Sequence, residues 1–211
     1  MVFEMGKYLY GKKEEPIPFE VVKQKVVSAN LDWNDEAFFW LLYYCGVRKS
    51  EAYERVAADF KITESHLIVD FHQRKKGGAQ VPPLELPLTW YGIDKIVRSV
   101  RNALKSRPKQ KAVYVYKDKK RVRILKEDRW VFPHIQSTKA WELVQNVLGE
   151  EYYPHFLRLN RLTEVAQDPT ASLTRLKSFS GIKSTTALDS YLGTVKKEQK
   201  KAIDYMSRKY E

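Results

Sequence analysis

The segment from Asn34 to Gly46 constrains the fold most, because it reads as a helix that is apolar on nearly every side. Asn34 or Asp35 can cap its start, the run EAFFWLLYYC follows, and Gly46 can end it. A helix with one apolar stripe covers one side of a core, whereas a helix that is apolar all round needs protein on every side. We therefore expect a central core helix surrounded by other elements.

Most of the surrounding segments have helical periodicity, and two have strand periodicity. Helices are expected at residues 19–28, from near residue 50, from residue 89 to before Pro108, and at 138–148, 154–167, 170–179, 184–192 and 194–210. Strands are expected in HLIVDFHQ and in AQVPPLELPL, with ADFKI as a candidate third strand, and Pro82 and Pro83 confine the last one to an edge or a bulge. A basic hairpin is expected around KDKK. The expected fold class is mainly α with a small antiparallel sheet, α+β.

The charge of the chain points to a polyanionic partner. The 211 residues include 38 Lys and Arg against 26 Asp and Glu, which gives a formal charge of +12 and favours nucleic acid first and a membrane surface second. No apolar run approaches the roughly 18 residues of a membrane span, and the start lacks a signal-peptide layout. The single cysteine, Cys45, can form no intrachain disulfide. We expect a cytoplasmic protein.

The positive charge is concentrated between Arg98 and Lys126. This stretch holds 12 Lys or Arg and one acid, Asp118. A solvated face is one interpretation, and a ridge that contacts phosphates is the other. The candidate DNA-binding residues at its centre are Lys119, Lys120, Arg121 and Arg123.

Two arginines lie where helix ends could present them to an anion. In GVRKSE, Arg48 follows Gly46 by two residues and precedes Glu51 by three. In PHFLRLNRL, His155 and Arg158 are three residues apart on a helix opened by proline, so they share a face. A guanidinium can bind two phosphate oxygens at once and stays charged at any working pH. An ordinary interhelical arginine and an incidental His and Arg pair are the alternatives.

Two other segments carry residue types that phosphate chemistry uses. Lys75 and Lys76 stand in a predicted strand turn just before two glycines. Tyr191, one of 13 tyrosines, closes the segment FSGIKSTTALDSYLG. Taken singly, lysines in turns serve solubility and tyrosines usually pack.

In this order the arginine box, the lysine turn, the His-x-x-Arg box and the tyrosine segment resemble the catalytic domain of tyrosine recombinases, the phage-type integrases. The resemblance runs from about Pro16 to the C-terminus, and its divergence looks like that of archaeal or viral integrases. It implies an enzyme that cuts and rejoins DNA through a 3′-phosphotyrosyl intermediate, with neither metal nor ATP as cofactor.

The resemblance also implies a role for each residue of the motifs. Tyr191 is the expected nucleophile, and Arg48 and Arg158 are the expected phosphate clamp. The general acid is Lys76, with Lys75 as the alternative. His155 serves as general base or as a hydrogen-bond partner of the phosphate. Glu51 is a supporting residue.

The sequence departs from the family pattern in two places. Gly181 falls where the family usually has His or Trp, so a hydrogen bond to the phosphate is missing or comes from Lys183 or Ser180. Leu159 stands where many members have a second His. An inactive DNA-binding module with the same fold, and strand relaxation by a type IB topoisomerase, are therefore the rival interpretations.

The expected organisation is a flexible lead-in at residues 1–15 and a catalytic domain at residues 16–211. The family's N-terminal core-binding domain is absent from this sequence, so the chain is a fragment or a minimal member. The expected partners are double-stranded DNA and further copies of the chain, up to a tetramer on DNA, with no membrane. The C-terminal helix VKKEQKKAIDYMSRKY could dock on a neighbour or fold back on its own domain.

Overall fold

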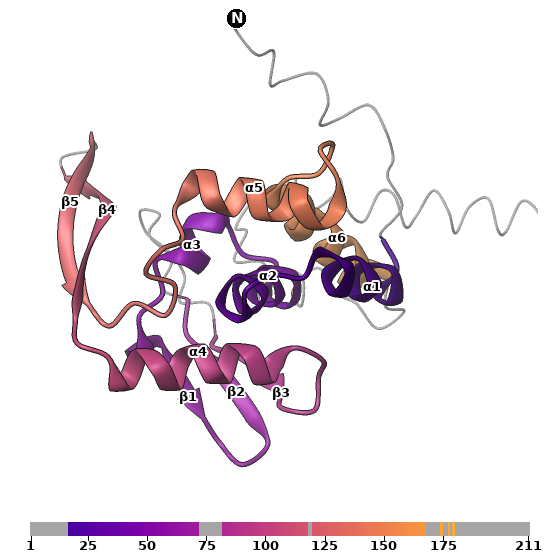
Figure 1. Cartoon of the computed structure of the whole chain (residues 1–211), viewed down its shortest axis with the longest axis horizontal. Coiled ribbons are helices and arrows are strands. Elements are labelled where there is room, and N and C mark those ends of the chain that lie inside the picture. Colours follow the sequence, from indigo (N-terminus) through magenta and orange to yellow (C-terminus); the bar gives the residue numbers. More distant parts are fainter. Residues whose placement is uncertain are drawn as a thin grey trace, which may run out of the picture.

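The computed structural model describes residues 17–71, 82–117 and 120–167, together with residues 174, 177 and 179. The helices and strands gather around one long buried helix, and a β-hairpin extends to one side (Figure 1). The helices are α1 (Phe19–Ala29), α2 (Trp33–Cys45), α3 (Lys49–Tyr53), α4 (Ile93–Lys105), α5 (Ser137–Leu148) and α6 (Pro154–Gln167), with a short 3-10 helix, η1 (Ala57–Asp59). The strands are β1 (Phe60–Ile62), β2 (His66–Val69), β3 (Leu84–Pro87), β4 (Lys109–Lys117) and β5 (Lys120–Asp128).

Helix α2 is the core element that its sequence predicts. Every residue from Ala37 to Cys45 is buried, and α4 and α6 pack against it on different sides. Figure 1 shows α2 between α5 and α4. The mainly helical fold with small antiparallel sheets is confirmed.

The cap of α2 differs from the predicted one. The side chain of Asp32, outside the expected start, accepts a hydrogen bond from the Asn34 backbone N–H at 2.9 Å. Asn34 and Asp35 are instead buried within the first turn of the helix. Asn34 Nδ2 donates to Ser99 Oγ at 2.8 Å, so the tertiary partner on α4 takes the side chain that the sequence offered as a cap.

The three-stranded sheet has the order β1-β2-β3, and both pairs are antiparallel. The candidate strand ADFKI does pair with β2, and β3 is an edge strand that begins directly after Pro82 and Pro83. The connection from β2 to β3, which includes residues 72–81, lies outside the described residues.

Helix α3 is shorter than the sequence suggests. It begins after Arg48 rather than at Ser50, and it ends at Tyr53. The chain then leaves the helix because Val56 forms a β-bridge with Trp130 and the Ala57 N–H donates to the Arg129 carbonyl. A contact with a segment about 70 residues away thus outweighs the local helical preference of ERVAA.

Candidate active site

The turn between α2 and α3 brings Arg48 to the surface. Gly46 ends α2 in the left-handed region with φ 55°, and its N–H bonds to the Leu42 carbonyl. The positive φ favours glycine, and a Cβ at this position would lie only 3.3 Å from Arg161 Cβ and 3.5 Å from the ring of Phe179. The turn therefore ends α2 and points the chain toward α3 within two residues.

Glu51 fixes Arg48 at the start of α3. The Arg48 backbone N–H donates to Glu51 Oε2 at 2.8 Å, and the guanidinium forms an ion pair with Glu51 Oε1 at 2.8 Å. The Arg48 side chain is 40% exposed, whereas the Glu51 side chain is 13% exposed. The partly buried carboxylate thus holds a guanidinium that is accessible to a ligand.

Arg158 reaches the same turn from α6. It is 3% exposed, and its guanidinium donates a hydrogen bond of 2.6 Å to the Gly46 carbonyl. That carbonyl lies at the end of α2, where helix ends leave acceptors without partners in the helix. The contact joins α6 to the turn that carries Arg48, across 112 residues of sequence.

His155 lies one turn before Arg158 on α6, on the same face of the helix. Desolvation, followed by the positive charges of Arg158 and Arg48, lowers the pKa of His155 below its usual value. Both arginines act on this ring, so the three side chains share one electrostatic neighbourhood. The imidazole is therefore neutral at physiological pH and can accept a proton.

Several predicted site residues lie outside the described part of the chain. They are Lys75, Lys76, Lys119, Gly181, Lys183 and Tyr191. Among the others, Arg48, Glu51, His155 and Arg158 come together at the junction of α2, α3 and α6. Lys120 and Arg123 are exposed on β5, far along the chain from this junction, and Arg121 is the β5 residue after Lys120.

Two residues at this junction, Arg161 and Phe179, were not predicted from the sequence as site residues. Arg161, one turn after Arg158, packs beside Gly46 and forms an ion pair with Glu164 at 2.9 Å. Its guanidinium lies 5.9 Å from the ring centroid of Phe179. Phe179 is the first residue of the segment FSGIKSTTALDSYLG, so this contact joins the start of the tyrosine segment to Arg161. The repeated three-residue spacing of His155, Arg158 and Arg161 could have indicated Arg161.

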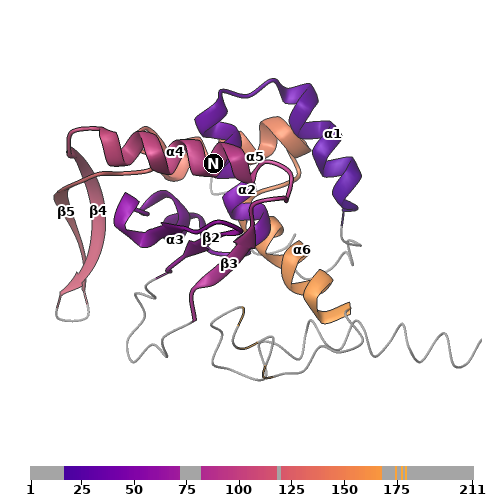
Figure 2. The same cartoon turned by 90° about the horizontal axis from the view of Figure 1, so that it is seen from below.

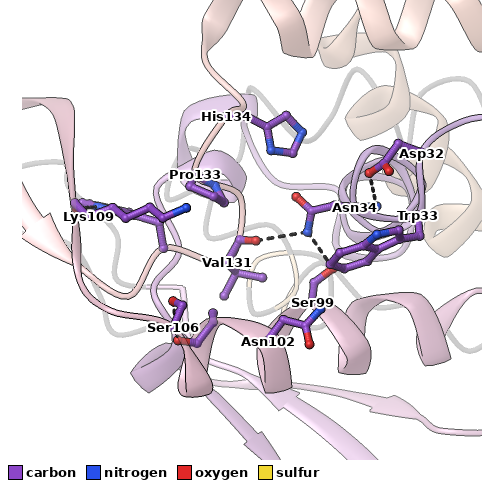
Figure 3. A pocket seen from close by; sticks show the side chains of 12 residues that line it. Asp32, Trp33, Asn34, Ser99, Asn102, Ser106, Lys109, Val131, Pro133 and His134 are labelled. Carbon is purple, nitrogen blue, oxygen red and sulfur yellow. Dashed lines mark hydrogen bonds between the residues drawn. The ribbon is translucent and has the colours of Figure 1, made fainter.

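A cavity of about 330 Å³ lies at the opposite end of α2 from this junction (Figure 3). Its lining includes Trp33, Asn34, Ser99 and His134, and Asn34 Nδ2 bonds there to Ser99 Oγ and to the Val131 carbonyl. The 13 residues of α2 separate it from Gly46 by about 20 Å. The cavity is thus a separate feature from the candidate site, which lies at the surface between helix ends.

Within the described residues, no group of three or more His, Cys, Asp or Glu is placed to hold a metal ion. His66 Nδ1 shares a hydrogen bond of 2.8 Å with Ser65 Oγ. No helix in the described ranges has the length and apolarity needed to cross a membrane.

Solved structures with the same architecture include recombinases that act on DNA. The XerH site-specific recombinase, bound to palindromic difH substrate after cleavage, matches with a TM-score of 0.65 over 93% of this chain at 13% identity. The XerA recombinase matches with a TM-score of 0.58 over 87% of the chain at 15% identity. The Tn1549 transposon integrase, in complex with transposon right end DNA, matches with a TM-score of 0.55 over 92% of the chain at 14% identity.

The fold is that of a tyrosine recombinase catalytic domain. The resemblance that the motifs suggest is therefore confirmed for the fold. The chain spans 54% of the XerH chain, 61% of the XerA chain and 68% of the Tn1549 integrase chain. No protein-family model matches the sequence, and no curated protein does either.

Proposed function

We propose that this chain is the catalytic domain of a tyrosine recombinase that cleaves and rejoins DNA strands through Tyr191. The observation that carries the proposal is the meeting of Arg48, His155 and Arg158 at one helix junction within a recombinase fold. The three residues come from segments more than 100 residues apart, and their order matches the order of the motifs. The fold and the electrostatics thus support the same site.

In the proposed first step, the Tyr191 oxygen attacks the scissile phosphorus. A bond from phosphorus to the tyrosine oxygen forms, the bond from phosphorus to the 5′ oxygen breaks, and a 3′-phosphotyrosyl link results. His155, neutral because of its lowered pKa, accepts the tyrosine proton or bonds to the phosphate. Lys76, or Lys75, donates a proton to the leaving 5′ oxygen.

Arg48 and Arg158 stabilise the charge that develops on the nonbridging oxygens during this step. Arg158 is held rigidly by burial and by the Gly46 carbonyl, and Arg48 is held by Glu51. A clamp oriented in advance needs little reorganisation when the charge develops.

In the second step, the 5′ hydroxyl of a partner strand attacks the phosphotyrosyl link and releases Tyr191. The energy of the phosphodiester is kept in the link, so no nucleotide has to be hydrolysed. Strand exchange requires copies of the chain on both duplexes, and we propose duplex DNA and self-association on DNA as its partners. We also place the protein with cellular DNA in the cytoplasm.

The test uses the full 211-residue chain and a pool of labelled nicked duplexes with random sequence around the nick. A covalent protein–DNA adduct that survives denaturation is expected from the wild type and is expected to be absent from Tyr191→Phe. Tyr205→Phe, in the same C-terminal part, is the matched control and should form the adduct. An adduct that persists in Tyr191→Phe excludes the proposed nucleophile.

Gly181, at the position where the family usually has His or Trp, favours a second candidate, an inactive DNA-binding module. That candidate predicts DNA binding without any adduct. Relaxation of a supercoiled plasmid without strand transfer between two labelled duplexes would identify topoisomerase activity instead.

A further inference from the structure

The β4–β5 hairpin is a separate two-stranded sheet that extends away from the helices (Figures 1 and 2). Its nine residue pairs run from Lys109↔Asp128 to Lys117↔Lys120. Nine residues of strand span about 25 to 30 Å. A two-stranded hairpin of this kind is marginally stable by itself in water, so its position depends on how its base is attached.

A small apolar cluster attaches the hairpin between its base and its middle. Val113 is 1% exposed and packs with Val56 and Trp130, with Ile124 beside them. The Trp130 indole Nε1–H donates to the Lys109 carbonyl at 2.7 Å. This cluster is distinct from the core around α2 and fixes the hairpin to the segment that follows α3.

Lys111 adds a polar anchor next to this cluster. Its ammonium is buried, donates to the carbonyls of Tyr53 and Phe132 at 2.6 Å each, and lies 5.3 Å from the Tyr53 ring centroid. These two carbonyls belong to the end of α3 and to the segment before α5. Lys111 thus bonds the part of β4 near its base to two separate segments, the end of α3 and the segment before α5.

The opposite face of the hairpin points to solvent. Directly paired residues in an antiparallel ladder share a face, so Tyr114↔Arg123 and Ala112↔Leu125 lie on the face away from Val113. Tyr114 is 38% exposed, Leu125 is 68% exposed, and Arg123 is exposed. This face of the hairpin therefore exposes a tyrosine from β4 together with a leucine and an arginine from β5, which is a surface that a partner can contact.

The positive charge of the hairpin favours a polyanionic partner. Residues 109–128 contain 8 Lys or Arg and 3 Asp or Glu, with KDKKR at the tip. Figure 2 shows the hairpin extending toward the same side of the molecule as the C-terminal end of α6 and the start of β3. The major groove of duplex DNA, about 12 Å wide, admits a two-stranded β-ribbon.

We propose that the β4–β5 hairpin is a DNA-contacting arm, which lays the face of Tyr114, Arg123 and Leu125 into the major groove of the duplex. Basic residues toward its tip contact the flanking phosphates, and the anchored base holds the arm at a fixed angle to the body. The inference rests on the proposed function in that it takes duplex DNA as the ligand, and it concerns contacts away from the site of strand cleavage.

The test compares Lys120→Ala/Arg123→Ala with the wild-type chain on a mixed-sequence duplex. Binding should weaken at least about tenfold, because each residue donates charge-assisted hydrogen bonds to the duplex. The slope of log affinity against log salt should become shallower by about 1 to 2, one for each lost phosphate contact. The matched control is Lys25→Gln/Lys95→Gln, which removes two charges from α1 and α4 and should bind as the wild type does.

A groove contact differs from nonspecific attraction in its footprint. Leu125→Ser keeps the charge, and it should alter base-methyl protection patterns in the major groove while leaving the salt slope unchanged. An unchanged major-groove pattern in Leu125→Ser, or wild-type DNA affinity in Lys120→Ala/Arg123→Ala, overturns the arm. Loss of self-association with intact DNA affinity would also overturn it, because the hairpin would then be a protein interface.

The experiments distinguish a wrong assignment of the arm from a wrong proposed function. The arm variants should still form the covalent adduct at saturating protein if Tyr191 acts as proposed. If no variant and no wild-type chain forms an adduct, but affinity still depends on the hairpin, the recombinase proposal fails and the arm stands.

Discussion

The arginine junction and the β4–β5 hairpin both present arginines, but the two regions hold them in different ways. Arg158 is 3% exposed and bonded to the Gly46 carbonyl, against a core that surrounds α2. Arg123 is exposed on a two-stranded ribbon whose only buried apolar contacts in the described residues are at its base. Burial fixes a charge to within the tolerance that chemistry requires, whereas an exposed ribbon suits contacts that tolerate adjustment. The two regions should therefore respond differently to substitution.

Arg158→Ala is expected to have the largest effect. Loss of a buried phosphate clamp should reduce adduct formation by about 10³-fold or more. The free energy of unfolding should also fall by about 1 to 3 kcal/mol, because the Gly46 carbonyl loses a buried donor. Adduct yield on nicked duplexes and urea denaturation measure the two effects, with Arg101→Ala, on exposed α4 surface, as the stability control. Wild-type adduct formation in Arg158→Ala would show that strand cleavage does not depend on the arginine junction.

Arg48→Gln should affect chemistry almost alone. Its side chain is 40% exposed, so the free energy of unfolding should change by less than about 1 kcal/mol. Adduct formation should still fall by about 10²- to 10³-fold, since the accessible half of the clamp is lost. Single-turnover cleavage rates and thermal unfolding provide the measurements. A large loss of stability would mean that Arg48 serves the fold rather than the site.

Val113→Ala should loosen the hairpin and leave the junction intact. Removal of two methyl groups from a site that is 1% exposed should cost about 2 kcal/mol of stability. Amide exchange should accelerate in β4 and β5, and adduct formation at saturating protein should stay unchanged. Val122→Ala, in the same ribbon at 37% exposure, is the control and should change neither quantity. Faster exchange in α6 would contradict the independence of the two regions.

Lys111 should make the free energy of unfolding depend on pH, with a smaller effect than the substitutions above. Burial lowers the pKa of Lys111 to about 7 from its model-peptide value of 10.5, and the charge of Glu54 opposes that shift. Unfolding above pH 7 then takes up a proton, because the unfolded lysine stays charged. The free energy of unfolding should therefore rise by about 1 kcal/mol per pH unit from pH 7 to pH 9. Urea denaturation should show this rise flattened in Lys111→Met, and equal slopes would refute it.

The sequence predicted the fold class. Local patterns were sufficient for this, since α2 is an apolar run that ends at Gly46, α4 has an apolar stripe, and α6 opens at Pro154. The motif order placed Arg48 and Arg158 in one fold, and the structure brings both to the same turn. The lysine turn and Tyr191 lie outside the described residues and stay predictions.

Features that depend on partners distant in sequence could not be predicted. The cap of α2 moved to Asp32 because Ser99 bonds to Asn34, and α3 ended early because Val56 pairs with Trp130. In the sequence, Lys111 is one more charge in a basic stretch, whereas in the structure its ammonium is buried and donates to two carbonyls.

Within the described residues, the sequence by itself determined where most of the helices and strands lie, and in what order the basic boxes follow one another. Periodicity and cap residues encode these properties locally. Only the tertiary structure decided which cations are buried and which are exposed. Arg158 and Arg123 belong to the same residue type, and their difference arises from what packs around each, which depends on long-range contacts that no local pattern contains.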